Sequence, residues 1–322
     1  MKKDRLYISI FLYCIVLSII LIFGLIKNST NYSGKSIQSA LINLKYKTSI
    51  NLIKLEFPHY ELIDSIVFTK KDFWKASAGG ISFNADSALL SNMLESFCAT
   101  QDFILLTDNF SAWEQFAITE QDAIHVSFYE STGGNDTLRS ELYFGKNTAD
   151  YSGVYVRNGK NASVYRIKSD FSSFLSPYID FWADLSVFQT QSQNLDNLKE
   201  TDIINVSVTK SNLDGNTQTA KLYEDGSSEY KSYIHTLFSL NGSGLVSLLD
   251  AESLGITRIL EINATNQSSK DFSVVVYTTH NDTELGARFF IQFKTDNDAS
   301  YPNYMTEISA WTYKNLLPQS FM

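Results

Sequence analysis

The chain has 322 residues, of which 44% are hydrophobic and 14% aromatic, enough to bury a sizeable core, and its length predicts two domains of ordinary size. The 26 Lys and Arg residues against 35 Asp and Glu give a net charge of −9, which argues against a clustered basic surface for nucleic acid. Two cysteines exclude a disulfide framework and a cysteine-rich zinc site.

An uncharged apolar segment lies near the start of the chain. Leu6 to Ile26 is 21 residues long, and as a helix it would span ~31 Å, matching the ~30 Å hydrocarbon core of a bilayer. Lys2, Lys3 and Arg5 precede it, so the positive-inside rule predicts a cytoplasmic N-terminus and an extracytoplasmic body. The alternative is a cleaved signal peptide, but its apolar region would be ~7–15 residues long and would end in a small-x-small site, which is lacking here. We therefore predict a single-pass cell-membrane protein with a cytoplasmic tip and uncleaved anchor at residues 1–27.

The body that follows is acidic. Residues 28–322 carry 22 basic and 34 acidic side chains, a net charge of −12, which argues against general electrostatic binding to anionic lipid headgroups. Cys98 is its only cysteine and lies near Leu94 and Phe97, so we predict a small buried hydrophobe rather than a reactive thiol.

Residues 28–60 read as a juxtamembrane connector. The segment starts with a polar stretch, and the spacing of Ile37, Leu41 and Leu44 favours a short helix.

A first α+β module is predicted over residues 61–190. Its clearest element is an amphipathic helix over 86–99, with Asp86 or Ser87 as the N-cap. Alternation in residues 123–129 places His125, Ser127 and Tyr129 on the polar side of a strand. Further strands are predicted at 65–69, 81–83, 141–144, 153–157 and 163–167, with turns at 133–136 and 158–159 and a short helix at 170–178.

A second module over residues 200–322 repeats this order, with a boundary near 190–202. The paired segments, all offset by about 140 residues, are 65–73 with 205–213, 86–99 with 228–240, 114–119 with 252–257, and 163–177 with 306–318. We interpret the repeat as tandem duplication of one module built on antiparallel sheets. The alternative is two α+β domains that share only the order of strands and helices.

Motifs that carry chemistry are missing from the sequence. It contains no phosphate-binding glycine loop and no nucleophile elbow. His59, His125, His235 and His280 have no partner at metal-ligand spacing, so we expect ordinary structural or surface histidines. Glu224-Asp225 and Asp296-Asn297-Asp298 could hold a hard cation, but they match no ordered calcium loop and favour solvated loop charge. We therefore assign no catalytic, cofactor-binding or metal-binding residue and predict no enzyme activity.

Four tryptophans, Trp74, Trp113, Trp182 and Trp311, lie on apolar stripes or beside strands. Core packing is favoured for them, although exposed aromatics can also stack on sugars or anchor a partner.

Several of these motifs together resemble the bacterial domain-of-unknown-function family 4340. The similar features are a strand before Trp74, the helix ADSALLSNMLESF, the segment QFAIT, a strand ending in LYFGK, and GVYVRNGKNASVYRI. The family has a Tyr-Gly-Leu where this chain has Phe116-Ala117-Ile118, whereas Phe144-Gly145 and Tyr155-Val156 fit the family pattern. Leu254-Gly255-Ile256 in the second half restores the missing glycine. The resemblance covers about 65–190 well, and 200–322 only through the repeat.

The resemblance implies a location more than an activity. Similar proteins have a membrane anchor followed by one or two such modules and are linked with gliding-motility-type ABC transporters, beside a permease and an auxiliary envelope subunit. No catalytic residue comes with the family. The leading hypothesis is thus a non-enzymatic accessory or scaffold of an ABC-type export or motility complex. The alternatives are a binding module for a cell-wall glycan or peptide, and a hydrolase with an unrecognised carboxylate pair.

Overall fold

The computed structural model describes residues 36–188, 199–211, 216–223, 227–268, 271–279, 286–295 and 303–321. The predicted anchor, Leu6 to Ile26, lies outside these residues, as do Glu224-Asp225 and Asp296-Asn297-Asp298. Within the described part of the chain, no helix is both long enough and apolar enough to span a membrane.

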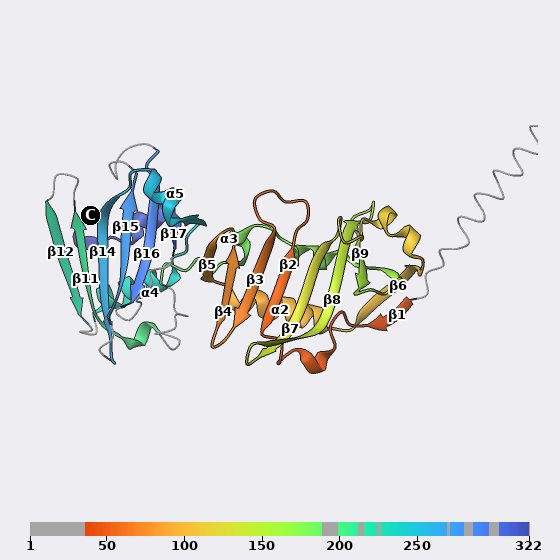
Figure 1. Ribbon diagram of the computed structural model, residues 1–322. Coiled ribbons are helices and arrows are strands. Elements are labelled where there is room, and N and C mark those ends of the chain that lie inside the picture. The colour runs from red at the N-terminus through yellow and green to blue at the C-terminus, as the bar shows by residue number, and fades with distance from the viewer. Residues whose placement is uncertain are drawn as a thin grey trace, which may run out of the picture.

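Two antiparallel sheets, with helices packed on them, make up the described fold, which is compatible with the predicted α+β class (Figure 1). The first sheet has the order β1-β6-β10-β9-β8-β7-β2-β3-β4-β5. Its strands are β1 (Ser36–Ser39), β2 (Leu52–Glu56), β3 (Ser65–Lys70), β4 (Trp74–Ala78), β5 (Ile81–Asn84), β6 (Gln101–Thr107), β7 (Ile124–Thr132), β8 (Asn135–Asn147), β9 (Gly153–Asn158) and β10 (Val164–Lys168).

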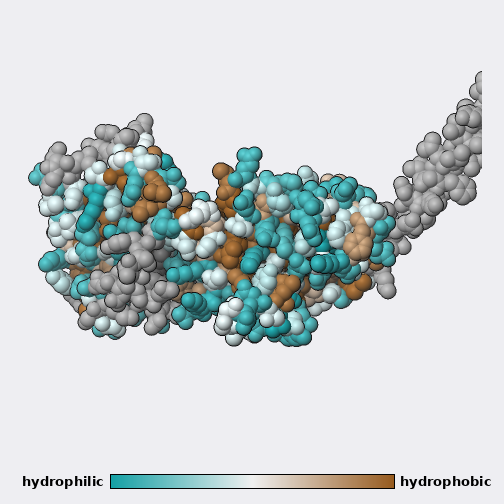
Figure 2. Space-filling model, in the orientation of Figure 1, coloured by the Kyte–Doolittle hydropathy of each residue, from teal (hydrophilic) through white to brown (hydrophobic). Residues whose placement is uncertain are grey.

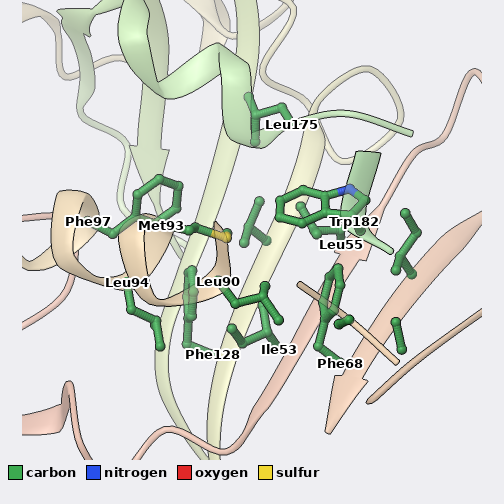
Figure 3. Close-up of a cluster of buried hydrophobic side chains, with 14 of the residues drawn as sticks. Ile53, Leu55, Phe68, Leu90, Met93, Leu94, Phe97, Phe128, Leu175 and Trp182 are labelled. Atoms are coloured by element: carbon green, nitrogen blue, oxygen red, sulfur yellow. The ribbon is translucent and has the colours of Figure 1, made fainter. Parts of the chain in front are cut away.

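One face of this sheet is covered by α2 (Ser87–Cys98). The carboxylate of Asp86 caps the helix by accepting from the backbone N–H groups of Ala88 and Leu89, as the sequence predicted. Apolar side chains from the helix meet those of the strands in a continuous core (Figure 3). This core includes Ile53, Leu55, Phe68, Leu90, Met93, Phe97, Phe128 and Trp182. Cys98 is buried at its margin, as predicted, and burial raises the pKa of its thiol.

The second sheet has the order β12-β11-β14-β15-β16-β17-β13. Its strands are β11 (Ile203–Ser211), β12 (Thr217–Tyr223), β13 (Gly244–Ser247), β14 (Thr257–Asn266), β15 (Asp271–Thr278), β16 (Phe289–Thr295) and β17 (Tyr304–Ile308). The helix α4 (Ser228–Ser239) buries Tyr230, Tyr233, Ile234 and Leu237 in a second core. Two shorter helices, α5 (Leu248–Ser253) and α6 (Ala310–Asn315), complete this half.

The predicted connector at residues 28–60 is wrong where the structure describes it. Residues 36–39 and 52–56 are strands of the first sheet, and β2 lies in its interior between β7 and β3. The helical spacing of Ile37, Leu41 and Leu44 misled the prediction, because Leu44 is 66% exposed while Leu41 is buried. Pairing with distant strands decided the outcome here rather than local periodicity.

Most of the other predicted elements of the first half are present, with shifted ends. The predicted helix over 170–178 is instead a 3-10 helix at Ser169–Phe174, followed by α3 (Ile179–Trp182). The predicted boundary is also slightly late, because Val187 and Phe188 already belong to the second core.

One of the repeat pairings is also wrong. The segment 65–73 holds β3, which pairs with β2, whereas 205–213 holds β11, which pairs directly with β14. By its place in the sheet, β11 corresponds to β2 rather than to β3. Sequence similarity between short alternating strands is weak evidence for equivalence, because many strands share the same alternation.

The two sheets lie side by side, and β1 and β12 are at opposite ends of the molecule (Figure 1). At the junction, the Asp180 carboxylate of α3 accepts a hydrogen bond from the backbone N–H of Leu245 in β13, at 2.6 Å. Asn303, just before β17, accepts from the N–H of Ser82 at 3.2 Å and donates to the carbonyl of Gly80 at 2.9 Å. Leu245 and Tyr304 also belong to the core of the first sheet.

Candidate functional site

Ionisable and aromatic side chains form a row across four neighbouring strands of the first sheet. Glu56 on β2 lies opposite His125 on β7, His125 lies opposite Tyr143 on β8, and Tyr143 lies opposite Arg157 on β9. Their core-facing neighbours along the strands, such as Leu55, Val126 and Leu142, are buried against the helix side. The row therefore lies on the face of the sheet opposite α2. We refer to Glu56, His125, Ser127, Glu141, Tyr143 and Arg157 as the His125 cluster.

His125 sits between two carboxylates. Its Nδ1 contacts Glu56 Oε2, and its Nε2 lies 3.1 Å from Glu141 Oε1 and 3.1 Å from the Ser127 hydroxyl. The ring stacks on Tyr143, with the two ring centroids 4.4 Å apart.

Arg157 is a charged side chain buried to 1% exposure. Its guanidinium lies between the rings of Tyr143 and Trp113, at 3.5 and 4.0 Å from their centroids. Its Nε donates to the carbonyl of Ile118 at 2.8 Å, and Nη1 donates to the carbonyl of Gly159. Burial lowers the pKa of Arg157, an effect that Tyr143 and two nearby glutamates oppose. Arg157 therefore fastens the loop before β7 to the sheet.

Tyr143 connects the two ends of the cluster. Its hydroxyl donates to Glu141 Oε1 at 3.2 Å, and its ring lies between His125 and Arg157. Burial and the charge of Glu141 raise the pKa of Tyr143, so the phenol stays protonated and keeps donating at neutral pH.

Ser127, His125 and Glu56 are arranged like a nucleophile, a base and its orienting carboxylate. Two features argue against acyl-transfer chemistry. The Nε2 that would accept the serine proton also lies 3.1 Å from Glu141 Oε1, so Ser127 is not its only neighbour. Ser127 is also only 2% exposed, so its hydroxyl has almost no access to a substrate. The geometry resembles a buried polar network more than a hydrolytic site, and within that network Arg157 Nη2 is a buried nitrogen without a hydrogen-bond partner.

The structure describes two of the other three histidines and only part of the residues considered as metal ligands. His59 lies 3.5 Å from Asp122 and His235 lies 3.1 Å from Glu200, both on the surface, and His280 lies outside the described residues. In the described part of the chain, no group of three or more His, Cys, Asp or Glu side chains could hold a metal ion.

The tryptophans divide into two classes. Trp74 and Trp182 are buried core residues as predicted, and Trp113 is partly buried over Arg157. Trp311 on α6 contradicts the prediction of core packing, because it is 68% exposed.

Sequence reasoning treated His125 as an ordinary histidine and missed the cluster. The available signal was that several strands carried ionisable residues on their polar side, but alternation does not show which strands become neighbours. On β14, β15 and β16, which match β7, β8 and β9 in the order of the sheet, the corresponding row is Arg258, Tyr277 and Phe290. In the second sheet the buried residue beside the tyrosine is Phe290 rather than an arginine, and among the described residues of that sheet no charged side chain is buried.

Hydrophilic side chains are spread over the viewed side of both sheets, with smaller apolar patches between them (Figure 2).

Comparison with known proteins assigns the family. The model of the domain of unknown function DUF4340 matches residues 77–268, which include strands of both sheets. An uncharacterized protein of Treponema pallidum (strain Nichols) is similar to the chain, with 25% identity over 191 residues. That alignment covers 58% of this chain, and the chain spans 58% of the length of that relative. No solved structure matches the chain. The family model covers more than half of the chain, which therefore belongs to the DUF4340 family.

Proposed function

We propose that this protein is a non-catalytic, membrane-anchored extracytoplasmic scaffold or accessory subunit of an ABC-type transporter or gliding-motility-like envelope complex. The apolar segment Leu6 to Ile26 supplies the anchor, and the two sheets form the body on the far side of the membrane. A permease or an auxiliary envelope subunit is the expected partner.

The observation that carries this proposal is the junction between the sheets. The side chain of Asp180 accepts a hydrogen bond from a backbone group of the other half, and the side chain of Asn303 both accepts and donates such bonds. Leu245 extends the first core across the boundary. Gly242 donates to the carbonyl of Leu185 at 2.7 Å, and Val187 donates to that of Leu240 at 3.0 Å. Backbone-directed bonds of this kind hold two modules at one spacing, which a scaffold requires.

The proposal includes a duplicated module. Setting aside β1 and the extra hairpin of β4 and β5, the order β6-β10-β9-β8-β7-β2-β3 matches β13-β17-β16-β15-β14-β11-β12. Ala117 and Gly255 occupy matching positions and both have a positive φ, at 53° and 68°. Each donates its N–H to a glutamate carbonyl three residues earlier, Glu114 or Glu252, at 3.1 and 3.0 Å. Shared topology and a shared unusual backbone angle favour common descent over coincidence.

Affinity purification of the tagged full chain from its native membranes tests the proposal. A permease or ABC-type envelope subunit should co-purify with the wild type and be lost when residues 1–27 are replaced by a cleavable secretion signal. The paired substitutions Asp180→Ala and Asn303→Ala should lower the yield while the anchor is intact. Recovery of no transporter component in any arm contradicts the proposed function.

One observation favours the alternative of a glycan- or peptide-binding module. Trp311 is 68% exposed on α6, and Tyr178 at the start of α3 is 69% exposed. Exposed aromatic rings of this kind can stack on sugars. Binding to cell-wall glycan fragments that is lost in Trp311→Ala but kept in Trp113→Phe would favour this alternative.

A further inference from the structure

β1 is a short edge strand with two different faces. On one face, Ser36 Oγ donates to Asp102 Oδ1 at 3.2 Å, and the Gln38 amide donates to the same oxygen. On the other face, Ile37 and Ser39 line a pocket. One edge of β1 pairs with β6, and no strand in the described part of the chain pairs with the outer edge. The outer edge therefore offers backbone N–H and C=O groups beside the pocket.

The pocket has a volume of about 170 Å³, is partly open to solvent and is lined by both apolar and polar side chains. Buried Leu41, Phe103, Leu142 and Val156 line it together with the buried, charged Arg157, and Asn158 and Asn161 lie at the hairpin beside it. This volume is enough for one large side chain, which would contact the apolar part of the lining.

We propose that β1 and this pocket form a docking site for an extended peptide segment of the membrane partner. The segment would add a strand at the outer edge of β1 and insert one large apolar side chain into the pocket. Strand addition of this type gains affinity from main-chain hydrogen bonds and specificity from pockets that take alternate side chains.

The position of the pocket along the chain indicates the occupant. Nine residues separate Ile26, the end of the predicted anchor, from Ser36. Fully extended, they reach at most about 35 Å. The site therefore stays within reach of extracytoplasmic loops of a membrane-embedded partner, and this step rests on the proposed function. The segment is expected to carry no basic residue at the pocket, because Arg157 is the only charged residue of its lining, whereas Asp102 lies at the other face of β1.

Selection of a displayed library of random ten-residue peptides against the purified full chain in nanodiscs tests the site. Enriched peptides should lack proline and contain one large apolar residue in an otherwise polar sequence. Their binding should slow hydrogen exchange at the amides of β1 and leave β12 unchanged. Failure to enrich any peptide, or protection of β12 instead of β1, overturns the proposal.

Two substitutions on the same strand form a matched pair. Ile37→Lys places a charge at the pocket and should weaken the selected peptides at least tenfold. Gln38→Lys places the same charge on the opposite face, near Asp102, and should change binding less than twofold. Ser39→Leu fills the pocket without adding a charge and should also weaken binding tenfold, which covers the case in which Ile37→Lys does not fold. Equal binding by wild type, Ile37→Lys and Ser39→Leu overturns the proposal.

Two controls are needed. The first distinguishes a peptide occupant from a lipid tail, and the second distinguishes failure of the docking site from failure of the proposed function. A fluorescent fatty acid that binds the wild type, is lost in Ile37→Lys and displaces the peptides would show a lipid tail as the occupant and overturn the proposal. A permease that co-purifies equally with wild type and Ile37→Lys overturns the docking site but leaves the proposed function standing. Absence of the permease from both contradicts the proposed function, while peptide selection still decides on the site.

Discussion

Ala117 and Gly255 share one left-handed backbone conformation at matching points of the two halves, with φ of 53° and 68°. Each residue ends a short helical segment. The segment at Ala117 is followed by β7, and the one at Gly255 is followed by β14. The left-handed region costs an L-residue roughly 1–2 kcal/mol relative to glycine. The first half therefore holds this strain at Ala117, while the second half avoids it.

Ala117→Gly should consequently stabilise the chain. The relief of strain exceeds the entropy that glycine adds to the unfolded state, and the expected gain is about 0.5–1 kcal/mol. The reciprocal change, Gly255→Ala, should lower the free energy of unfolding by about 1 kcal/mol. Backbone strain alone causes this loss, because a Cβ at this position would meet no atom within 4 Å. Urea unfolding of both variants checks the signs, and a loss of stability in Ala117→Gly would contradict the argument.

Arg157→Met should destabilise the first half by about 2–3 kcal/mol. The change leaves the carbonyls of Ile118 and Gly159 without their donor and removes the cation from between two rings. Arg139→Met is the matched control, since Arg139 pairs with a partly exposed Glu130 and should cost below about 1 kcal/mol. Urea midpoints measure both values, and equal losses would show that Arg157 has no special fastening role.

The junction should be sensitive to one methyl group. A Cβ on Gly242 would collide with Thr306 and come within 2.9 Å of the carbonyl of Glu307, whereas a Cβ on Gly244 would lie 3.0 Å from the Asp180 carboxylate. Gly242→Ala should therefore cost about 1–3 kcal/mol, and Gly244→Ala should cost less. Thermal unfolding and limited proteolysis at the junction compare the two variants. A smaller loss for Gly242→Ala would show that the strands there can move apart.

Asp184, beside the junction, gives a prediction about pH. Burial raises its pKa, the Ser186 N–H and hydroxyl oppose that rise, and the charge of Asp86 adds to it. The folded state thus favours the neutral acid, and the stability that this provides is present at low pH and lost as pH rises through the folded pKa. Asp184→Asn, which is neutral at every pH, should be more stable than wild type near about pH 7, with a gap that narrows toward about pH 4. A constant gap in urea midpoints would contradict this assignment.

Asp150 should behave in the opposite sense and serves as the contrast. Hydrogen bonds from Thr148 and Ser152 lower its pKa to about 2. Its charged form therefore contributes stability above the ordinary carboxyl pKa, and that contribution is lost as pH falls through about 2. Asp150→Asn should be less stable than wild type at neutral pH, with a difference that shrinks in acid. The same midpoints measured in parallel test both aspartates.

The predicted anchor can be tested by fractionation. The full chain should remain in the membrane pellet after alkaline carbonate extraction, whereas a chain lacking residues 1–27 should not. Leu17→Arg, in the middle of the apolar segment, adds roughly 2.5–3.5 kcal/mol to membrane insertion and should shift part of the chain out of the pellet. Release of the full wild-type chain by carbonate would contradict an uncleaved anchor.

Local patterns were sufficient for elements whose own residues decide their structure. The stripe over 86–99 and the cap at Asp86 predicted α2, and Asn158-Gly159 predicted the turn between β9 and β10. The positive φ angles of Gly133 and Gly134 likewise agree with the turn predicted there. These features depend on hydrogen bonds and side-chain contacts within a few residues of sequence.

The sequence by itself therefore determined the mixed strand and helix content, the apolar segment near the start, the buried Cys98 and the family. Only the tertiary structure decided that β2 enters the middle of the first sheet and that His125, Glu56 and Glu141 meet. Only the tertiary structure placed β1 beside a pocket that is lined by residues of four other strands of the sheet. The physical reason is the same in each case, because strand alternation shows which side chains share a face, whereas the neighbours of a strand are chosen by pairing across long stretches of sequence.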